Sequence, residues 1–489
     1  MTPWPDRPII HEINTWVWLY ELSQRYGRAI SLGTVPPQEW DALAAWGLDA
    51  IWLMGVWERS PASIRIAAAD AGLQAEFLRA LPDLTPKDIV GSPYSVHRYL
   101  VDEQLGGQAG LAAARQQLAE RGLRLILDFV PNHVACDHPW VLEHPDYFIQ
   151  GSAEERAKKP GEFFEAGGKV LAHGRDPYFP PWLDVAQLNI FHPELRRAAI
   201  ATLRDIASQC DGVRCDMAML LINRIFSLTW GQRSGPVPNT EFWPEAIHAL
   251  RQQYPNFLFV AEVYWDLERE LQQQGFDYCY DKGLYDHLQR EKAESVRILL
   301  SADLPFQKKL VRFIENHDEA RAAAVFPKEK SRVAAVTIAT LPGAQLFHDG
   351  QFEGRFIKVP LQLGRRPAEP LDSQTWAFYC ELMSVIRADG FRKGDWRLCE
   401  QSGWPDNASH LNLLAWCWRA GDDRYLIVVN LSAATSQGRI RVPWNDLAGN
   451  SWRLTDLFSG EVYEREDNEL CDPGLYVELA PWGFHCLHF

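Results

Sequence analysis

Acidic residues follow four short apolar runs in this sequence of 489 residues, and their types and positions could support chemistry. An acid placed directly after apolar β-type residues is costly to bury unless it is solvated, paired or used. One such acid would indicate a helix cap or a loop salt bridge. Four of them, accompanied by two histidines and an arginine, indicate instead a shared functional site. The acids are Asp128, Asp216, Glu262 and Asp318, and the accompanying residues are His133, Arg214 and His317.

Three of these acids, Asp216, Glu262 and Asp318, suit the cleavage of a glycosidic bond. A retaining mechanism needs two carboxyl groups about 5 Å apart, one to attack the anomeric carbon and one to protonate the leaving oxygen. Arg214 precedes Asp216 by two residues, so both side chains would lie on the same face of a strand. We expect the charge of Arg214 to lower the pKa of Asp216, while a less compensated Glu262 keeps its proton near neutral pH. Asp318 and the two histidines would then bind sugar hydroxyls.

The elements that must position these residues alternate between short β-type runs and helical patterns. Such alternation predicts an α/β fold, a (β/α)8 TIM barrel, in which the carboxyl ends of all strands meet at one rim. An open doubly wound sheet is the alternative, but no glycine-rich phosphate turn follows the first run. The expected strands are Ile9–Leu19, Ala50–Val56, Leu123–Val130, Gly212–Asp216, Phe257–Val263, Phe276–Tyr280, Leu310–Glu315 and Ala344–His348, and helices are expected at Gly110–Arg121, Pro193–Cys210, Glu245–Gln253 and Lys330–Thr340.

Two segments interrupt this alternation. Cys136 to Leu188 is rich in Pro, Gly, Lys and Asp without helical periodicity, and a long insert of this kind after strand 3 is usually a functional excursion. After about Gly394 short strands separated by turn residues predict a C-terminal antiparallel β-sandwich domain. The expected strands there are Leu411–Trp418, Tyr425–Leu431, Gly438–Val442 and Tyr476–Leu479, and the expected domains are a catalytic barrel at 1–133 and 190–393, an inserted loop-rich domain B at 134–189 and a C-terminal β domain at 394–489.

Composition narrows the classes of partner. The formal net charge of -15 disfavours nucleic acid and anionic membrane surfaces as partners, and we expect neither. The 20 Trp, 15 Tyr and 23 Phe mostly suit a large core, but aromatic faces also stack on sugar rings, so a carbohydrate substrate is favoured. The first residues do not resemble a secretory signal, no run has the length of a membrane span, and nine cysteines lie without CxxC spacing. A cytoplasmic protein with reduced thiols is therefore expected, of unknown oligomeric state.

The four acid-bearing segments resemble, in the same order, the four signature regions of the α-amylase superfamily of glycoside hydrolases. They are Asp128–His133, Gly212–Asp216, Glu262 with its apolar lead, and Asn316–Asp318; Asp184–Asn189 also resembles the segment that closes the insert in that family. The resemblance spans roughly Ile9 to Gly390, and a C-terminal β domain fits it too. It implies that Asp216 is the nucleophile, Glu262 the acid/base and Asp318 the transition-state stabiliser. It also implies a subsite for the attacked sugar lined by Tyr94, His133, Arg214 and His317.

Departures from the family pattern concern specificity and metal binding. Met219 and Leu220 stand where many starch-degrading members have a Lys-His pair, and Arg98 stands where an Asp is common. A small-substrate hydrolase or a transferase is therefore favoured over an enzyme with a long-glucan groove. Asn132 matches a position that ligates structural Ca2+ in many members, but the insert lacks a dense set of acids, so no cofactor or metal is expected.

Several alternatives remain open at this point. The chain could be a catalytically silent scaffold, although such a protein would be expected to have lost at least one of the three carboxylates. It could instead be a metal-dependent barrel enzyme whose ligands are Asp128, Asp216, Glu262 and His317. Whether water or a sugar intercepts the covalent intermediate, giving hydrolysis or glucosyl or maltosyl transfer, does not follow from the residues. Single residues have structural alternatives too: Asp128 and Asn132 could be architectural, Tyr94 could be a packing residue, and Glu315 is expected to be a supporting or surface acid.

Overall fold

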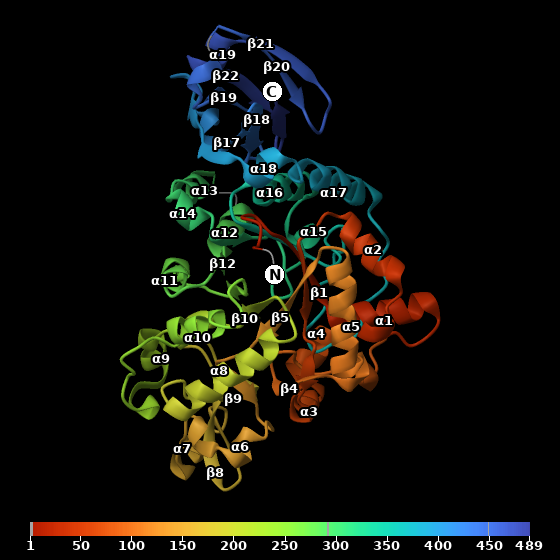
Figure 1. The fold of residues 1–489 in the computed structure, drawn as a ribbon, viewed down its shortest axis with the longest axis vertical. Helices are drawn as coiled ribbons and strands as arrows, with labels where there is room; N and C mark the ends of the chain where they lie inside the picture. The colour runs from red at the N-terminus through yellow and green to blue at the C-terminus, as the bar shows by residue number, and fades with distance from the viewer. Residues whose placement is uncertain (1–2, 291–292, 448) are drawn as a thin grey trace. The chain divides into compact units, whose positions relative to one another are not determined.

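The computed structural model describes residues 3–290, 293–447 and 449–489. The chain divides into two compact units, which are described separately. The first comprises Met1–Trp4, Ile10–Tyr280 and Ile357–Ala368, and the second comprises Pro5–Ile9, Asp281–Phe356 and Glu369–Phe489. Figure 1 follows the chain from β1, in red, to the last strands, in blue.

Eight parallel strands form a closed barrel in the order β1-β14-β13-β12-β11-β10-β5-β2. The predicted α/β barrel is therefore confirmed. Most of its strands consist wholly of buried residues, as parallel strands covered on both faces require. Their bounds are β1 (Ile9–Asn14), β2 (Ala50–Met54), β5 (Arg124–Phe129), β10 (Gly212–Cys215), β11 (Leu258–Ala261), β12 (Tyr278–Tyr280), β13 (Leu310–Arg312) and β14 (Ala344–His348).

Helices follow most of these strands, including the four that the sequence predicts. In the first unit they are α1 (Thr15–Tyr26), α2 (Pro37–Ala45), α3 (Pro61–Ala69), α4 (Ala71–Ala80), α5 (Gly107–Glu120), α8 (Pro193–Ala207), α9 (Asn223–Trp230), α10 (Phe242–Arg251) and α11 (Glu268–Gln273). In the second they are α12 (Lys282–Gln289), α13 (Ala293–Leu300), α14 (Leu304–Gln307), α15 (Ala322–Val325), α16 (Lys328–Thr340), α17 (Ser373–Ile386) and α18 (Asp389–Lys393).

The first predicted strand is wrong in its second half. Ile9–Leu19 was expected to be one strand, but β1 ends at Asn14 and α1 begins at Thr15. The side chain of Asn14 accepts a hydrogen bond from the Val17 backbone N–H, which caps the helix. Valine and tryptophan favour strands when considered alone, so the run of apolar residues concealed this boundary.

The insert after β5 contains regular structure that the sequence analysis did not predict. A four-stranded antiparallel sheet runs in the order β6-β9-β8-β7, with bounds β6 (His133–Ala135), β7 (Phe163–Ala166), β8 (Lys169–Gly174) and β9 (Trp182–Gln187). Two short helices, α6 (Trp140–Glu143) and α7 (Ala153–Lys158), lie between these strands in the sequence. The β7–β8 hairpin turns at Gly167 and Gly168, both with positive φ, and this Gly-Gly pair is a hairpin signal that was missed. The insert was expected to be a loop-rich domain, and its sheet was not predicted.

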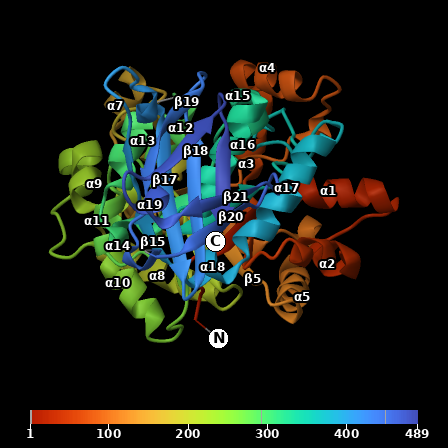
Figure 2. The ribbon, with the colours of Figure 1, turned by 90° about the horizontal axis from the view of Figure 1, so that it is seen from above.

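The C-terminal segment forms two antiparallel sheets, as predicted. The first has the order β15-β17-β18-β23-β20-β21 and the second the order β16-β19-β22. Alternate residues of β17, β18 and β22, together with Ile440 of β19, belong to one apolar cluster, which is the pattern of a two-sheet core. In Figure 2 the blue ribbons of β17 and β18 run side by side. The bounds are β15 (Asp395–Leu398), β16 (Glu400–Ser402), β17 (Leu413–Ala420), β18 (Asp423–Asn430), β19 (Ser436–Arg441), β20 (Ser451–Asp456), β21 (Val462–Glu466), α19 (Asp467–Cys471), β22 (Leu475–Leu479) and β23 (Phe484–His488).

The state of the cysteines and the search for membrane-spanning helices bear on the expected location of the protein. All nine cysteines are free thiols, and most of them are buried. Within the described part of the chain, no helix combines the length and apolar character needed to cross a bilayer.

Candidate active site

Asp216 and Glu262 lie directly after the neighbouring parallel strands β10 and β11. Their backbones are fixed by the barrel, because the N–H of Asp216 donates to Phe129 at 2.8 Å and the N–H of Glu262 donates to Cys215 at 3.0 Å. The register that pairs Cys215 with Ala261 brings the two acids side by side. Both are almost completely buried, at 4% and 3% exposure.

One arginine binds both carboxylates. Arg214 Nη1 lies 2.7 Å from Asp216 Oδ1, and Arg214 Nη2 lies 2.9 Å from Glu262 Oε2. The two acids thus contact the two terminal nitrogens of a single guanidinium group. Burial alone would lower the pKa of Arg214, but the negative charges of Glu262 and Asp216 more than offset this and raise its pKa, so the arginine stays charged.

The expectation of a less compensated Glu262 is wrong. Besides Arg214, its Oε2 accepts the backbone N–H of Met217 at 2.6 Å, and its Oε1 accepts the hydroxyl of Tyr264 at 2.8 Å. The sequence could not reveal the contact with Arg214, because that contact depends on the pairing of two strands some 45 residues apart. The barrel rim therefore contains two carboxylates that share one fixed positive charge.

His133 lies beside this pair as the first residue of β6. Its Nε2 is 3.9 Å from Asp216 Oδ2, and its side chain is buried. Burial lowers the pKa of His133 to about 4, so the ring is neutral near pH 7. The centroid of the His133 ring lies 5.2 Å from that of Trp182. A neutral imidazole at this position can hydrogen-bond a substrate hydroxyl without adding charge.

Tyr94 packs against the same arginine. The Arg214 guanidinium carbon lies 4.9 Å from the centre of the Tyr94 ring, and the ring is partly exposed. The loop that carries Tyr94 is held by Arg59, whose Nη1 donates to the Gly91 carbonyl at 2.7 Å. The structure thus brings five of the seven predicted site residues together in the first unit, at Tyr94, His133, Arg214, Asp216 and Glu262.

His317 and Asp318 belong to the second unit and pair with each other. Strand β13 ends at Arg312, earlier than predicted, so both residues lie on the loop that follows it. Asn316 Oδ1 accepts the backbone N–H of Asp318 at 2.9 Å, which fixes the turn. His317 Nε2 lies 2.9 Å from Asp318 Oδ2; the histidine is buried, whereas the Asp318 side chain is 33% exposed.

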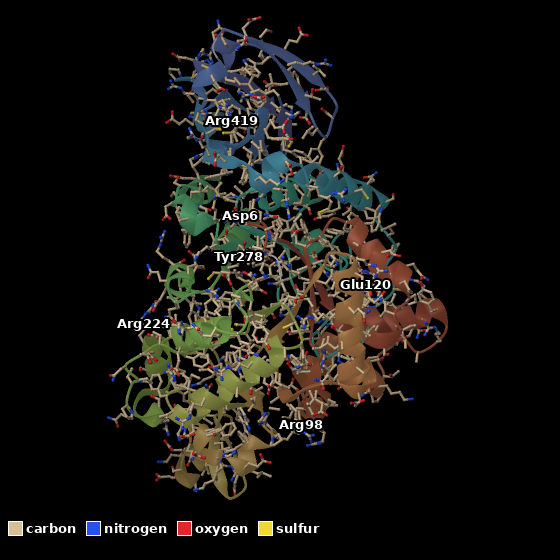
Figure 3. All side chains as sticks on the ribbon, viewed as in Figure 1. Asp6, Arg98, Glu120, Arg224, Tyr278 and Arg419 are labelled. Atoms are coloured by element: carbon tan, nitrogen blue, oxygen red, sulfur yellow. The ribbon has the colours of Figure 1, made fainter. Side chains whose placement is uncertain are left out.

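Other candidates from the sequence have structural partners. Asp128 accepts the Trp52 indole N–H at 3.2 Å and the Gly55 N–H at 3.0 Å. Asn132 Oδ1 accepts a hydrogen bond from the Gln187 side chain at 3.0 Å. Arg98, labelled in Figure 3, is half exposed and lies 3.5 Å from Glu58. Each of these side chains thus has a partner within the protein.

Three further residues that the sequence singled out are buried. Met219 and Leu220, which replace the Lys-His pair, are 0% and 2% exposed, so neither offers a polar group to a ligand. Glu315 was expected to be a supporting or a surface acid, and its 1% exposure and its pairing with Arg321 fit the supporting alternative.

The sequence analysis missed Met217 and Tyr264, which both donate to Glu262. Tyr264 follows Glu262 by two residues, a spacing that would have suggested a shared face. The donor from Met217 is a backbone N–H in a left-handed residue with φ 43°, for which the side chain gives no signal. Among the residues that the structure describes, no three His, Cys, Asp or Glu side chains gather as metal ligands.

Comparison with known proteins identifies the family. Residues 38–413, more than half of the chain, match the model of the α-amylase catalytic domain. The chain therefore belongs to the α-amylase family. It is similar to an α-amylase of Haloarcula japonica, with 26% identity over 63% of this chain and 42% of that protein. It is also similar to a cyclomaltodextrinase of Geobacillus thermopakistaniensis, with 21% identity over 78% of this chain and 62% of that protein. The chain thus spans about half the length of these curated relatives.

Solved structures share the fold. A maltogenic α-amylase from Thermotoga neapolitana superposes with a TM-score of 0.70 over 99% of both chains, at 17% identity. An α-amylase from Geobacillus thermoleovorans, solved with acarbose, superposes with a TM-score of 0.68 over 100% of this chain and 99% of that one, at 17% identity. At such identities the likeness concerns the barrel and the C-terminal domain, not the substrate.

Proposed function

We propose that this protein is a retaining α-glycosidase that acts on α-glucosidic bonds of small or oligomeric α-glucan-type substrates by double displacement. The observation that carries this proposal is the contact of Arg214 with both Asp216 and Glu262. It holds two carboxyl groups at the adjacent nitrogens of one planar cation, which suits the short separation of a retaining pair.

The charge balance of this site supports different roles for the two acids. One guanidinium contacts both carboxylates, and two ionised carboxylates at such a short separation would repel each other. Such a coupled pair favours holding one proton near neutral pH. With Asp216 ionised and Glu262 protonated, the pair contains the nucleophile and the acid that the first step requires.

In the first step an oxygen of Asp216 forms a bond to the anomeric carbon while the bond from that carbon to the leaving oxygen breaks. Glu262 gives its proton to the leaving oxygen. In the second step water bonds to the anomeric carbon and loses a proton to Glu262, and the ester bond to Asp216 breaks with its electrons returning to the carboxylate. Two inversions leave the α configuration unchanged.

The remaining predicted residues are proposed to hold the attacked sugar. Tyr94 supplies an aromatic face, and the neutral His133 supplies a hydrogen-bonding edge. We assign His317 to hydroxyl binding and Asp318 to stabilising the transition state, as in the family that the chain belongs to. We propose that no metal or cofactor takes part in the reaction. We also propose that the protein is cytoplasmic, and its nine free thiols support this location.

Substitution of Asp216 by glycine tests the assignment. We expect activity towards an aryl α-glucoside to fall by about four orders of magnitude or more, as for other nucleophiles. Added azide should then restore turnover and give the β-glucosyl azide, because azide attacks from the side that Asp216 vacates. The wild-type enzyme, assayed with azide and after treatment with EDTA, is the control and should release glucose in both cases. Formation of the α-azide would overturn the role of Asp216, and loss of wild-type activity in EDTA would overturn the metal-free mechanism.

A further inference from the structure

A small cavity of the second unit lies between helices α16 and α17, which lie side by side in Figures 1 and 2. Its volume is about 120 Å³, which is room for several water molecules or for one small polar group. Residues of both helices and of the loop after β14 line it, and they are distinct from the seven predicted site residues. What the cavity can hold therefore follows from its own side chains.

Three cationic side chains line this cavity. Lys328 and Arg332 belong to α16, and Arg355 belongs to the loop after β14. The stem of Arg355 passes close to Gly350, where an added Cβ would lie 2.7 Å from it. Like charges around one partly enclosed space repel each other, so a bound anion would be stabilised there. The charge of the lining thus favours a negatively charged ligand.

Arg332 is held in place without an ion pair. Its guanidinium carbon lies 5.5 Å from the centre of the Phe378 ring on α17. Its Nε is buried and has no hydrogen-bond acceptor among the described residues. The exposed Glu381, also on α17, interacts with this charge through space and forms no ion pair with it in the described part of the chain. A guanidinium positioned in this way suits an oxyanion, which can accept two of its hydrogen bonds.

The two carboxylates that line the cavity already have partners. Glu315 is buried and pairs with Arg321 at 2.7 Å. Asp372 caps α17, because its Oδ1 accepts two backbone N–H groups of the first turn, and it also lies 3.4 Å from Lys328. The charge of Arg332 is therefore not matched by either acid of the lining.

Both helices contribute their N-terminal turns to the cavity. Helix α16 begins at Lys328 and α17 at Ser373, and the lining includes Ser331 and Thr375 from these turns. The N-cap of α16 is Pro327, which supplies no side-chain hydrogen bond to the first turn. The N-terminal end of a helix carries a partial positive charge that stabilises anions, and hydroxyl groups add further donors.

From these features together we propose that the cavity binds a phosphate group, held by Lys328, Arg332 and the hydroxyl of Ser331. A phosphate group carries about two negative charges near pH 7 and presents several acceptor oxygens, which suits two cations and a hydroxyl better than a carboxylate does. The ligand is either inorganic phosphate or a phosphate ester whose remainder lies outside the cavity. Two lining residues, Glu315 and Ala322, flank the loop with Asp318, so a bound phosphate would stabilise that part of the second unit.

The test measures binding directly, so it does not depend on the proposed function. Isothermal titration calorimetry of the full chain in a phosphate-free buffer at constant ionic strength uses two probes, inorganic phosphate and glycerol 3-phosphate. We expect one site per chain with a Kd of about 1 mM or lower for at least one probe. Tighter binding of inorganic phosphate would identify the free ion as the ligand, and tighter binding of glycerol 3-phosphate would identify an ester.

Variants locate the site. Lys328→Gln and Arg332→Gln should each weaken phosphate binding about tenfold, which corresponds to the loss of one charge-assisted contact. Lys308→Gln removes an exposed lysine at the end of α14 in the same unit and should bind as wild type does. Urea unfolding should show that all three variants fold, because the altered side chains are partly or fully exposed. Equal affinities in wild type and in both cavity variants would overturn the proposal, and so would an absence of heat with both probes at about ten times the expected Kd.

Discussion

Each unit contains a buried cluster of acid, arginine and histidine side chains. In the first unit Arg214 contacts both Asp216 and Glu262, with His133 nearby. In the second unit Arg321 contacts Glu315 at 2.7 Å, with His348 at 3.4 Å from the same carboxylate. The residue types are the same, yet the charge balance differs, because two carboxylates share one arginine in the first cluster and Glu315 has Arg321 to itself in the second.

The second cluster shows what a structural ion pair looks like in this fold. Glu315 Oε2 accepts the backbone N–H of Ala322 at 2.6 Å, and Arg321 also donates to the carbonyl of Asp349 at 2.9 Å. Burial alone would raise the pKa of Glu315, but Arg321 and His348 together lower it. A matched charge pair of this kind joins loops, whereas the first cluster sets two carboxylates against one arginine. We infer that this difference in charge balance, and not burial or the presence of arginine, distinguishes the proposed catalytic cluster from the structural one.

The same substitution in the two clusters should separate these roles, and its largest effect is expected at Glu262. For Glu262→Gln we expect kcat/KM for maltotriose to fall about 10²–10⁴-fold, the usual contribution of a general acid. An aryl α-glucoside with a strongly acidic phenol should lose far less, because its leaving group needs no proton. The fold should persist, since Arg214 keeps Asp216 as its partner. Steady-state kinetics with both substrates check this, and equal losses on the two would contradict the acid role.

Glu315→Gln should act on stability instead. It leaves Arg321 buried without its matching charge, a change that typically costs about 3–5 kcal/mol. Because the pKa of Glu315 is lowered in the folded protein, its stabilising charge is fully present above the unfolded value of about 4.3 and is lost as the pH falls through the lower folded value. Urea unfolding at pH 7, 5 and 3 should therefore show a difference from wild type that shrinks at pH 3.

A matched control for Glu315→Gln is Glu329→Gln, which removes an exposed acid from the first turn of α16. It should change the free energy of unfolding by less than about 1 kcal/mol. If Glu315→Gln were as mild as this control, the second cluster would not be the structural ion pair described above.

The comparison also shows where reasoning from the sequence succeeds. Short apolar runs predicted the eight barrel strands, because parallel strands buried on both faces need continuous apolar residues. Acids at the ends of those runs predicted the pairing of Asp216 with Glu262 at one end of β10 and β11. Arg214 was placed on the side of Asp216 by the two-residue period of a strand, and the 2.7 Å contact confirms it.

Other features depend on contacts that one segment does not encode. The bond from Arg214 to Glu262 needs the register of two strands, and the donor from Met217 is a backbone group. The helix that begins at Thr15 starts there because Asn14 caps it, although the Trp and Val residues that follow favour a strand. The sheet of the insert was not predicted because its strands are short. Its hairpin signal, Gly167-Gly168, lies in a segment rich in Pro, Gly, Lys and Asp, which resembles a loop. The local sequence pattern thus predicted where strands and helices lie along the chain better than it predicted which groups contact each other.

The smallest predicted effect concerns His133, the histidine of the first cluster. His133 has a folded pKa of about 4 against an unfolded value of about 6.5, so acid favours the unfolded chain, which binds the proton more readily. Protonation of His133 therefore does not affect the free energy of unfolding above pH 6.5. As the pH falls from 6.5 to about 4, the free energy of unfolding decreases progressively, by up to about 3 kcal/mol. His133→Gln should lack this part of the pH dependence when urea unfolding is measured between pH 7 and 4.

Other buried histidines also titrate in this window, so the quantity to compare is the difference between wild type and variant. His248→Gln, which removes an exposed histidine on α10, is the control and should follow the wild-type curve. A His133→Gln curve parallel to wild type would mean that His133 is readily protonated in the folded protein. The site would then contain a second positive charge, and the excess of negative charge that separates the first cluster from the second would no longer hold.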